Sequence, residues 1–236
     1  VLYRTGDDDL TVSNSDLGQG GQDNNGNSLN ALGNGTVVTA SASNVDITTN
    51  NDIGVQSGGD AVDAIRVNDG SVSGGVDIAD VDIDGDDTAD TDGIFIKSVG
   101  SSDVAIDNGV TPSTASSISD VDTGVQVDAA GNNGLKNIDD TSFTNIGSKA
   151  IDVNDPGNFD GALTIEGISV DGSTSATGVE FRSDQSANLE VVDSGLGNGS
   201  KTSLDTGIDA AEPDSPGFGV TVDAVEIGLA DNGGNG

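Results

Sequence analysis

Three short strands follow one another in the stretch Leu163-Thr164-Ile165-Glu166-Gly167-Ile168-Ser169-Val170 and, after a loop, Gly178-Val179-Glu180-Phe181. A glycine bend at Gly167 separates the first strand from the second. In each strand apolar and polar residues alternate, which is typical of a β-strand with one buried and one exposed face. The strands are shorter than those of ordinary β-sandwiches. The segment therefore predicts short strands that are joined by bends and loops into a coil.

The same alternating pattern recurs behind a glycine or an alanine at intervals that are mostly about two to three dozen residues long. We identify this slot at Gly93-Ile94-Phe95-Ile96, Gly124-Val125-Gln126-Val127, Ala150-Ile151-Asp152-Val153, Gly178-Val179-Glu180-Phe181, Gly207-Ile208-Asp209 and Gly219-Val220-Thr221-Val222. Repeats of this kind predict a solenoid, in which each coil pairs its strands with those of its neighbours. The fold class is then all-β, and a β-sandwich is the alternative.

These repeats resemble those of right-handed parallel β-helix proteins of the pectate-lyase-like superfamily. The segment Ile227-Gly228-Leu229-Ala230-Asp231-Asn232-Gly233-Gly234 resembles a stretch near the end of β-helix domains in bacterial surface proteins and adhesins. The resemblance implies a right-handed parallel β-helix with long polar loops, an extracellular or cell-surface location, and a structural or adhesive role.

We expect one β-helix domain over residues 1–236, with coils at roughly 36–228, a polar loop at 13–35 and a flexible tail at 229–236. A β-helix has two ends whose strand edges lack a partner, and such edges favour pairing with further strands. The chain is therefore expected to associate with itself, or to continue into more of the same structure, through its open ends.

The chain has 7 basic and 41 acidic residues, which gives a formal net charge of −34. Such a charge repels nucleic acid and other polyanions and attracts cations. No hydrophobic run is long enough to predict a membrane span. Five of the acids are Glu and the rest are Asp, a residue that favours turns and the coordination of hard cations. Cell-surface glycans remain conceivable partners.

The densest acidic stretch runs from Asp80 to Gly93, and its beginning, Asp80-Val81-Asp82-Ile83-Asp84-Gly85, matches the opening of a calcium-binding loop. The match is incomplete, because Thr91 stands where the loop needs a bidentate Glu. The simpler interpretation is a strand in which Val81 and Ile83 point inward. A looser calcium site in the following turn is the sharper hypothesis. Its candidate ligands are Asp80, Asp82, Asp84, Asp86, Asp87, Asp90 and Asp92.

Stacked coils would also align outward Asp residues about 4.8 Å apart and so create ladders of like charge. The candidates are Asp77, Asp82, Asp103, Asp107, Asp122, Asp128 and Asp152. Calcium bridging such ladders would stiffen the coil, and adaptation to high salt is the alternative explanation of the acidity.

The sequence does not favour an enzyme. It contains no His, and no basic cluster surrounds Arg66 or Arg182, although polysaccharide-cleaving β-helices rely on such groups. Phe95 and Phe181 are predicted to pack in the core, and the lysines, Lys149 among them, to pair with Asp on the surface. We therefore expect an extracellular structural or interaction module of a surface fibre, layer or adhesin. The alternative is a carbohydrate-binding or polysaccharide-degrading β-helix.

Overall fold

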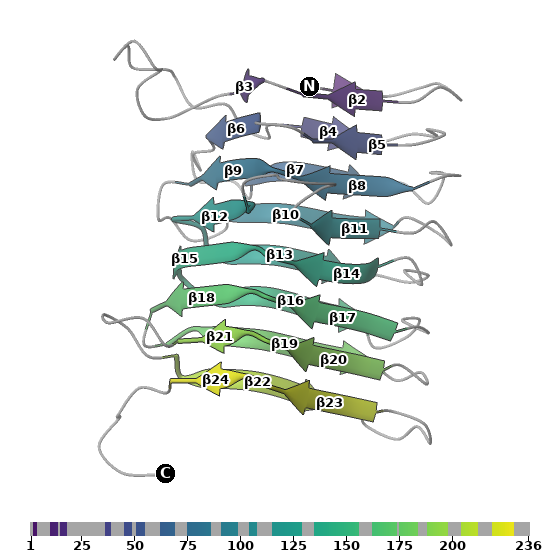
Figure 1. Cartoon of the computed structure of the whole chain (residues 1–236). Coiled ribbons are helices and arrows are strands. Elements are labelled where there is room, and N and C mark those ends of the chain that lie inside the picture. The colour runs from purple at the N-terminus through teal and green to yellow at the C-terminus, as the bar shows by residue number, and fades with distance from the viewer. Residues whose placement is uncertain are drawn as a thin grey trace.

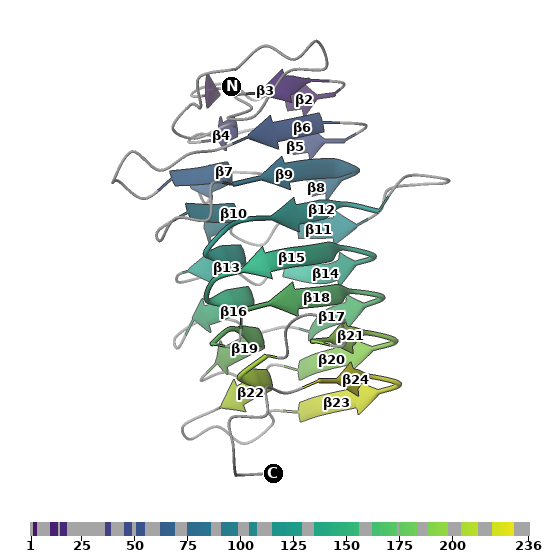
Figure 2. The same ribbon diagram turned by 90° about the vertical axis from the view of Figure 1, so that its left-hand side faces the viewer.

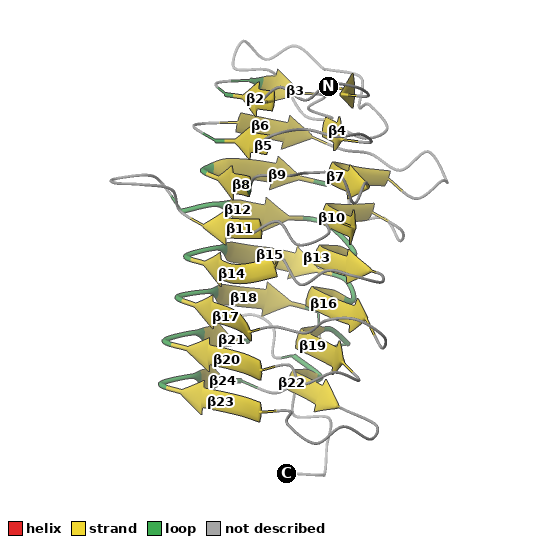
Figure 3. Cartoon of the chain, turned by 90° about the vertical axis from the view of Figure 1, so that its right-hand side faces the viewer, coloured by secondary structure: helices red, strands yellow, loops and turns green. Residues whose placement is uncertain are grey.

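The structure is a computed structural model, and it describes residues 2–3, 10–13, 15–17, 36–38, 45–48, 51–54, 62–68, 75–85, 91–98, 104–107, 115–128, 135–155, 162–173, 175–183, 188–197, 204–211 and 219–228. In these residues the chain forms strands and turns and no helix (Figure 3). The strands make three sheets of eight strands each, and every pairing within them is parallel.

Sheet A contains β1 (Leu2–Tyr3), β4 (Thr36–Val38), β7 (Val62–Asn68), β10 (Thr91–Ser98), β13 (Thr123–Asp128), β16 (Lys149–Asp155), β19 (Thr177–Ser183) and β22 (Thr206–Ala211). Sheet B contains β2 (Leu10–Val12), β5 (Val45–Ile47), β8 (Val76–Ala79), β11 (Val104–Asp107), β14 (Leu135–Asp139), β17 (Ala162–Glu166), β20 (Asn188–Val192) and β23 (Gly219–Asp223). Sheet C contains β3 (Asp16–Leu17), β6 (Asn51–Gly54), β9 (Val81–Asp84), β12 (Ser117–Ser119), β15 (Ser142–Ile146), β18 (Ser169–Gly172), β21 (Gly195–Leu196) and β24 (Glu226–Ile227).

The chain visits sheets A, B and C in turn, so that each coil contributes one strand to each sheet (Figures 1 and 2). In Figure 1 the chain runs to the left along the front strands, returns to the right behind them and descends, which makes the coil right-handed. The predicted parallel β-helix is confirmed, and the β-sandwich alternative is wrong. The first coil begins at Leu2 and includes β3, so the coils start well before the predicted residue 36. Residues 18–35, the larger part of the predicted polar loop, and the predicted tail lie outside the described residues.

Apolar side chains form columns that run through the inside of the coil, because residues in register on successive parallel strands stack on one another. One column descends sheet B without interruption, and its members are Val12, Ile47, Ile78, Ile106, Ile138, Ile165, Val191 and Val222. All of these except Val222 belong to the buried core, which continues without a break from Val12 to Leu204. The β-branched residues that dominate the composition thus fill a narrow core along its whole length.

The glycine slot that the sequence repeats is a column of small residues in sheet A. The register aligns Gly93 with Gly124, and Ala150 with Gly178. A Cβ on Gly124 would lie 2.5 Å from the carbonyl oxygen of Ala150 and 2.6 Å from the ring of Phe143. The slot is therefore kept small because the next coil approaches it closely. Gly219 was assigned to the same slot, and this was wrong, since Gly219 lies in β23 of sheet B.

The corner between sheets B and C is a turn in which one residue has a positive φ. This residue is Asp80, Asp140, Gly167, Asp193 or Ala224, depending on the coil. Asp adopts the left-handed region more readily than most residues, because its short polar side chain can bond locally. Part of the Asp excess is therefore explained by the geometry of the corners.

Candidate functional sites on one face and at one end of the coil

The acidic motif that begins at Asp80 is built largely from corner and strand residues. Asp80 is the corner residue between β8 and β9, with a φ of 53°. Asp82 and Asp84 point outward from β9, while Val81 and Ile83 between them are buried. Asp82 accepts a hydrogen bond from Ser117 on β12, and the Ser119 hydroxyl donates to Asp84 over 3.2 Å. The simpler interpretation, with Val81 and Ile83 pointing inward, is confirmed.

The remaining candidate calcium ligands belong to the connection that leads from β9 to β10 and to β10 itself. Asp86, Asp87 and Asp90 lie outside the described residues, whereas Asp92 lies in sheet A, across the corner from Asp82 and Asp84 in sheet C. Burial raises the pKa of Asp84, and the neighbouring Asp120 adds to the rise. Within the described part of the chain, no three acidic residues come together as a metal-binding group. The calcium site remains a prediction.

Outward acids do align between coils, but in short runs. Asp77 stands opposite Asp46, Asp82 opposite Asp52, and Asp152 opposite Glu180. Beyond Asp77 and Asp82 the ladders continue with Ala105 and Ser117, which carry no charge. Asp103 lies outside the described residues. Two of these ladders hold three acids in a row, because Asp16 stands opposite Asp52 and Asp209 stands opposite Glu180, so repulsion is limited to runs of two or three acids.

Sheet A carries a pair of acids on its outward face, of which one is buried and the other is partly buried. Asp63 on β7 and Asp92 on β10 are opposite each other in register. The side chain of Asp63 is only 3 % exposed, and Arg66 binds its carboxylate at 2.7 Å. Burial raises the pKa of Asp63 in spite of Arg66. The pKa of Asp92 rises to about 7, first because of burial and then because of the charges on Asp63, Asp122 and Asp152.

Further along the same face, basic side chains alternate with acids. Lys149 contacts Asp152 at 2.7 Å and Glu180 at 3.3 Å, and so joins two coils. Arg182 contacts Glu180 within its own coil and Asp209 in the next. Burial acts to lower the pKa of Lys149, but the hydrogen bond and charge of Asp152, with Glu180, raise it overall. The predicted pairing of Lys149 with Asp is confirmed, and it links neighbouring coils.

The two phenylalanines of the repeated slot have different positions. Phe181 lies in the core, as predicted. Phe95 was predicted to be buried at an inward position; it is buried, but the inward position was wrong, because its ring stands on the outward side between Arg66 and Gln126 in register. The guanidinium carbon of Arg66 lies 4.6 Å from the centre of the ring, which is a cation–π contact. Phe95 is nevertheless buried, so this pair does not form an exposed sugar platform.

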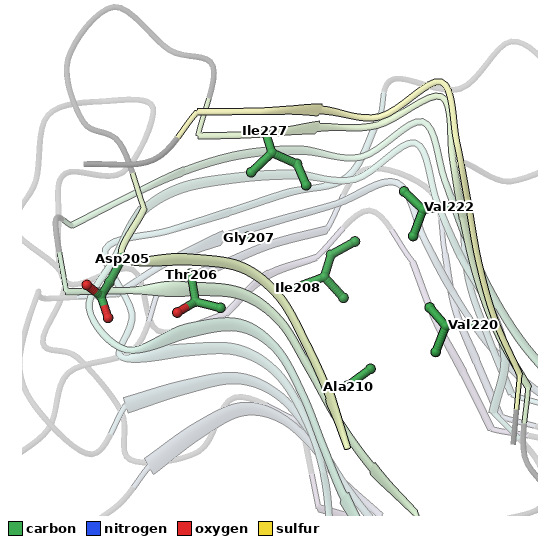
Figure 4. Close-up of a pocket in the computed structure, with 8 residues that line it drawn as sticks. All are labelled: Asp205, Thr206, Gly207, Ile208, Ala210, Val220, Val222 and Ile227. Atoms are coloured by element: carbon green, nitrogen blue, oxygen red, sulfur yellow. The ribbon is translucent and has the colours of Figure 1, made fainter. Parts of the chain in front are cut away.

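The C-terminal end of the coil contains a hollow of about 680 Å³ (Figure 4). Asp205, Thr206, Gly207, Ile208, Ala210, Val220, Val222 and Ile227 line it. Ile227 and Val222 point into the hollow from two sides and Ile208 from a third (Figure 4). Val220, Val222 and Ile227 are 42 %, 49 % and 46 % exposed, although they occupy core positions of the coil. The last coil therefore presents the cross-section of the core to solvent.

The two ends of the coil differ. Val12, which begins the sheet B column that ends at Val222, is only 5 % exposed. At the C-terminal end, β22, β23 and β24 are each the last strand of their sheets, so each has one edge without a partner strand. The exposed apolar side chains lie at this same end. The sequence predicted open ends in general but could not indicate this difference.

The fold defines the chain as a parallel β-helix protein with a polar, ion-paired sheet A and an open C-terminal coil. Comparison with protein-family models, with curated proteins and with solved structures finds no match to this chain. Within the described residues there is no helix long and apolar enough to cross a membrane.

Proposed function

We propose that the chain is a structural or interaction module of an extracellular fibre, surface layer or adhesin, and that its coil is extended through the C-terminal end. The exposed core residues Val220, Val222 and Ile227 carry this proposal. Burying one such side chain fully stabilises a protein by about 1.5–3 kcal/mol, so the open coil gains free energy when a further coil covers it.

The body of the coil supports the same role. Inward columns continue from coil to coil, and the Lys149 and Arg182 ion pairs tie neighbouring coils together on the outside. A rod of this construction transmits force and separates its two ends by a defined distance. The resemblance of residues 227–234 to a stretch of bacterial surface β-helix domains agrees with an extracellular location, and we propose membership in the pectate-lyase-like superfamily from the resemblance of the repeats.

A carbohydrate-binding or polysaccharide-degrading β-helix is the weaker hypothesis. Sugar sites rely on exposed aromatic rings, and the ring of Phe95 is buried against Arg66. The hollow at the C-terminal end is lined mainly by aliphatic side chains. Neither feature favours a polysaccharide ligand.

Electron microscopy of the native material tests the proposal. We expect rods or a layer whose unit has the diameter of a single coil stack. A population of isolated particles that cleave or bind polysaccharides, with no assembly at any salt concentration, would contradict the structural role.

A further inference from the structure

We infer that the stack opens between its second and third coils at low ionic strength and closes there when salt is added. The second coil consists of β4, β5 and β6, and the third coil consists of β7, β8 and β9. The inference goes beyond the proposed function, because it gives the coil a conformational device that responds to the ions around it.

Acids of the second and third coils face each other in two of the three sheets. Asp46 on β5 lies opposite Asp77 on β8, and Asp52 on β6 lies opposite Asp82 on β9 in register. Asp46 and Asp77 are half-buried, and Asp82 is exposed. Neighbouring strands lie about 4.8 Å apart, and like charges directly opposite each other destabilise the pairing of two strands. Electrostatic repulsion therefore acts on this junction in both sheet B and sheet C.

The ladders of this junction are also short in sheets A and B. β4 and β5 have three residues each. At the junction of the sixth and seventh coils, β16 and β19 have seven residues each, and β17 and β20 have five each. The hydrogen bonds of a parallel ladder are evenly spaced, so their number grows with the length of the paired strands. Fewer backbone hydrogen bonds thus oppose the repulsion between the second and third coils.

The next junction, between the third and fourth coils, also has opposite acids, which are Asp63 and Asp92. Here a base joins the two coils, because Arg66 binds Asp63 and stacks on the ring of Phe95 in the fourth coil. β7 and β10 have seven and eight residues, so their ladder is longer than the one that joins β7 to β4. The third coil is therefore held more firmly to the fourth coil than to the second.

The junction between the sixth and seventh coils has the opposite response to salt. Asp152 and Glu180 lie opposite each other, and Lys149 contacts the first at 2.7 Å and the second at 3.3 Å. Charges interact over about 30 Å at about 0.01 M salt, but over only about 3 Å at about 1 M. Salt therefore relieves the repulsion between the second and third coils, whereas it weakens the ion pairs between the sixth and seventh.

The first test measures how fast buried thiols react in the full chain, which has no Cys of its own. Val76→Cys places a thiol inside the third coil, and Val191→Cys places one inside the seventh; the two valines are 1 % and 0 % exposed. In chelator-treated protein, we expect a maleimide to label Val76→Cys about tenfold faster at about 0.01 M salt than at about 1 M, and the rate for Val191→Cys to change by less than about threefold. The overall charge of −34 acts on both junctions, so an equal salt dependence of the two rates would overturn the inference.

The second test removes the opposite charges. Asp46→Asn combined with Asp82→Asn neutralises one acid of each pair, and it should abolish most of the salt dependence of Val76→Cys labelling. Glu190→Gln combined with Asp223→Asn removes the same amount of charge from positions opposite uncharged residues, and it should leave that salt dependence unchanged. If both double variants lose the salt dependence to the same extent, the overall charge opens the stack and the inference is wrong.

Hydrogen exchange of the unaltered chain provides a third test that needs no substitution. Amide protection reports the local opening of each part of a structure. The amides of β8 should lose protection relative to those of β20 as the salt concentration is lowered, and they should regain it when salt is restored. A constant ratio of the two exchange rates at all salt concentrations would contradict an opening between the second and third coils.

Discussion

Asp63 in β7 and Asp92 in β10 lie opposite each other on adjacent parallel strands of sheet A, and the charge on Asp63 helps to raise the pKa of Asp92. A buried and a partly buried carboxylate in this position cannot both be ionised without repulsion, so one of them retains a proton to a higher pH. Asp122 and Asp152 add negative charge nearby, and Arg66 partly offsets it on Asp63. Among the described acids, Asp92 of this pair has the pKa that is raised most.

This pair predicts that the protein is more stable in mild acid than at alkaline pH. The pKa of Asp92 is about 7 in the folded chain and near 3.8 when unfolded, so the folded state holds the extra proton. The stabilisation is complete below the unfolded pKa and is lost as pH rises through 7. With allowance for partial exposure, it amounts to about 2–4 kcal/mol. Denaturant unfolding from pH 4 to 9 measures it.

The Asp92→Asn variant is the control for the pH prediction. It should lose most of the difference in stability between pH 5 and pH 8, since the amide needs no proton to accept or donate a hydrogen bond. Asp223→Asn, at the far end of the coil, should keep that difference. If the wild type and Asp92→Asn show the same pH profile, the pair does not titrate as described.

The small-residue column predicts that Gly124→Ala destabilises the coil by about 2–3 kcal/mol, because the added Cβ meets both the Ala150 carbonyl oxygen and the Phe143 ring. The opposite change in the same column, Ala150→Gly, should cost only about 1 kcal/mol or less. Thermal unfolding of the two variants measures the difference. Equal losses would mean that the close approach of the coils does not determine the residue in this slot.

The corner between sheets B and C predicts a different response to glycine. Asp193 is exposed and has a φ of 46°, and its N–H donates to the carbonyl oxygen of Asp223 in the next coil. Asp193→Gly should change stability by less than about 1 kcal/mol, whereas Asp193→Val should cost about 1–2 kcal/mol, because a β-branched residue strains the left-handed region. A tolerated valine in unfolding experiments would contradict this account of the corner.

Calcium is predicted to raise the melting temperature of chelator-treated protein more than sodium does at equal ionic strength. The outward acids of β9, Asp82 and Asp84, flank the connection to β10 that carries Asp86, Asp87 and Asp90. Calcium prefers such carboxylate oxygens. The Asp82→Asn, Asp84→Asn double variant should lose part of the rise measured by calorimetry, and Asp223→Asn with Glu226→Gln should keep it. An unchanged melting temperature in calcium would refute the calcium site.

The coil itself was predictable from local patterns. Around Ile165 and Val179 apolar and polar residues alternate, because successive side chains of a strand point to opposite sides. This period of two residues is visible in any short segment of the sequence. The small slot at Gly93 and Gly124 was equally visible, because the same close approach recurs once per coil. Where the prediction relied on the alternation alone, it assigned Gly219 to the wrong sheet and Phe95 to the wrong side of its strand.

The pairing of coils could not be predicted in the same way. Asp63 meets Asp92, and Arg66 covers Phe95, only because two strands far apart in the sequence adopt one particular register. That register depends on the lengths and paths of the connections between strands, which the alternation does not encode. For the same reason the sequence predicted open ends, but only the structure showed that Val222 is exposed while Val12 is buried. The sequence by itself determined that short strands with one apolar side coil around a narrow core; the tertiary structure decided which side chains of neighbouring coils meet, and which end of the core remains uncovered.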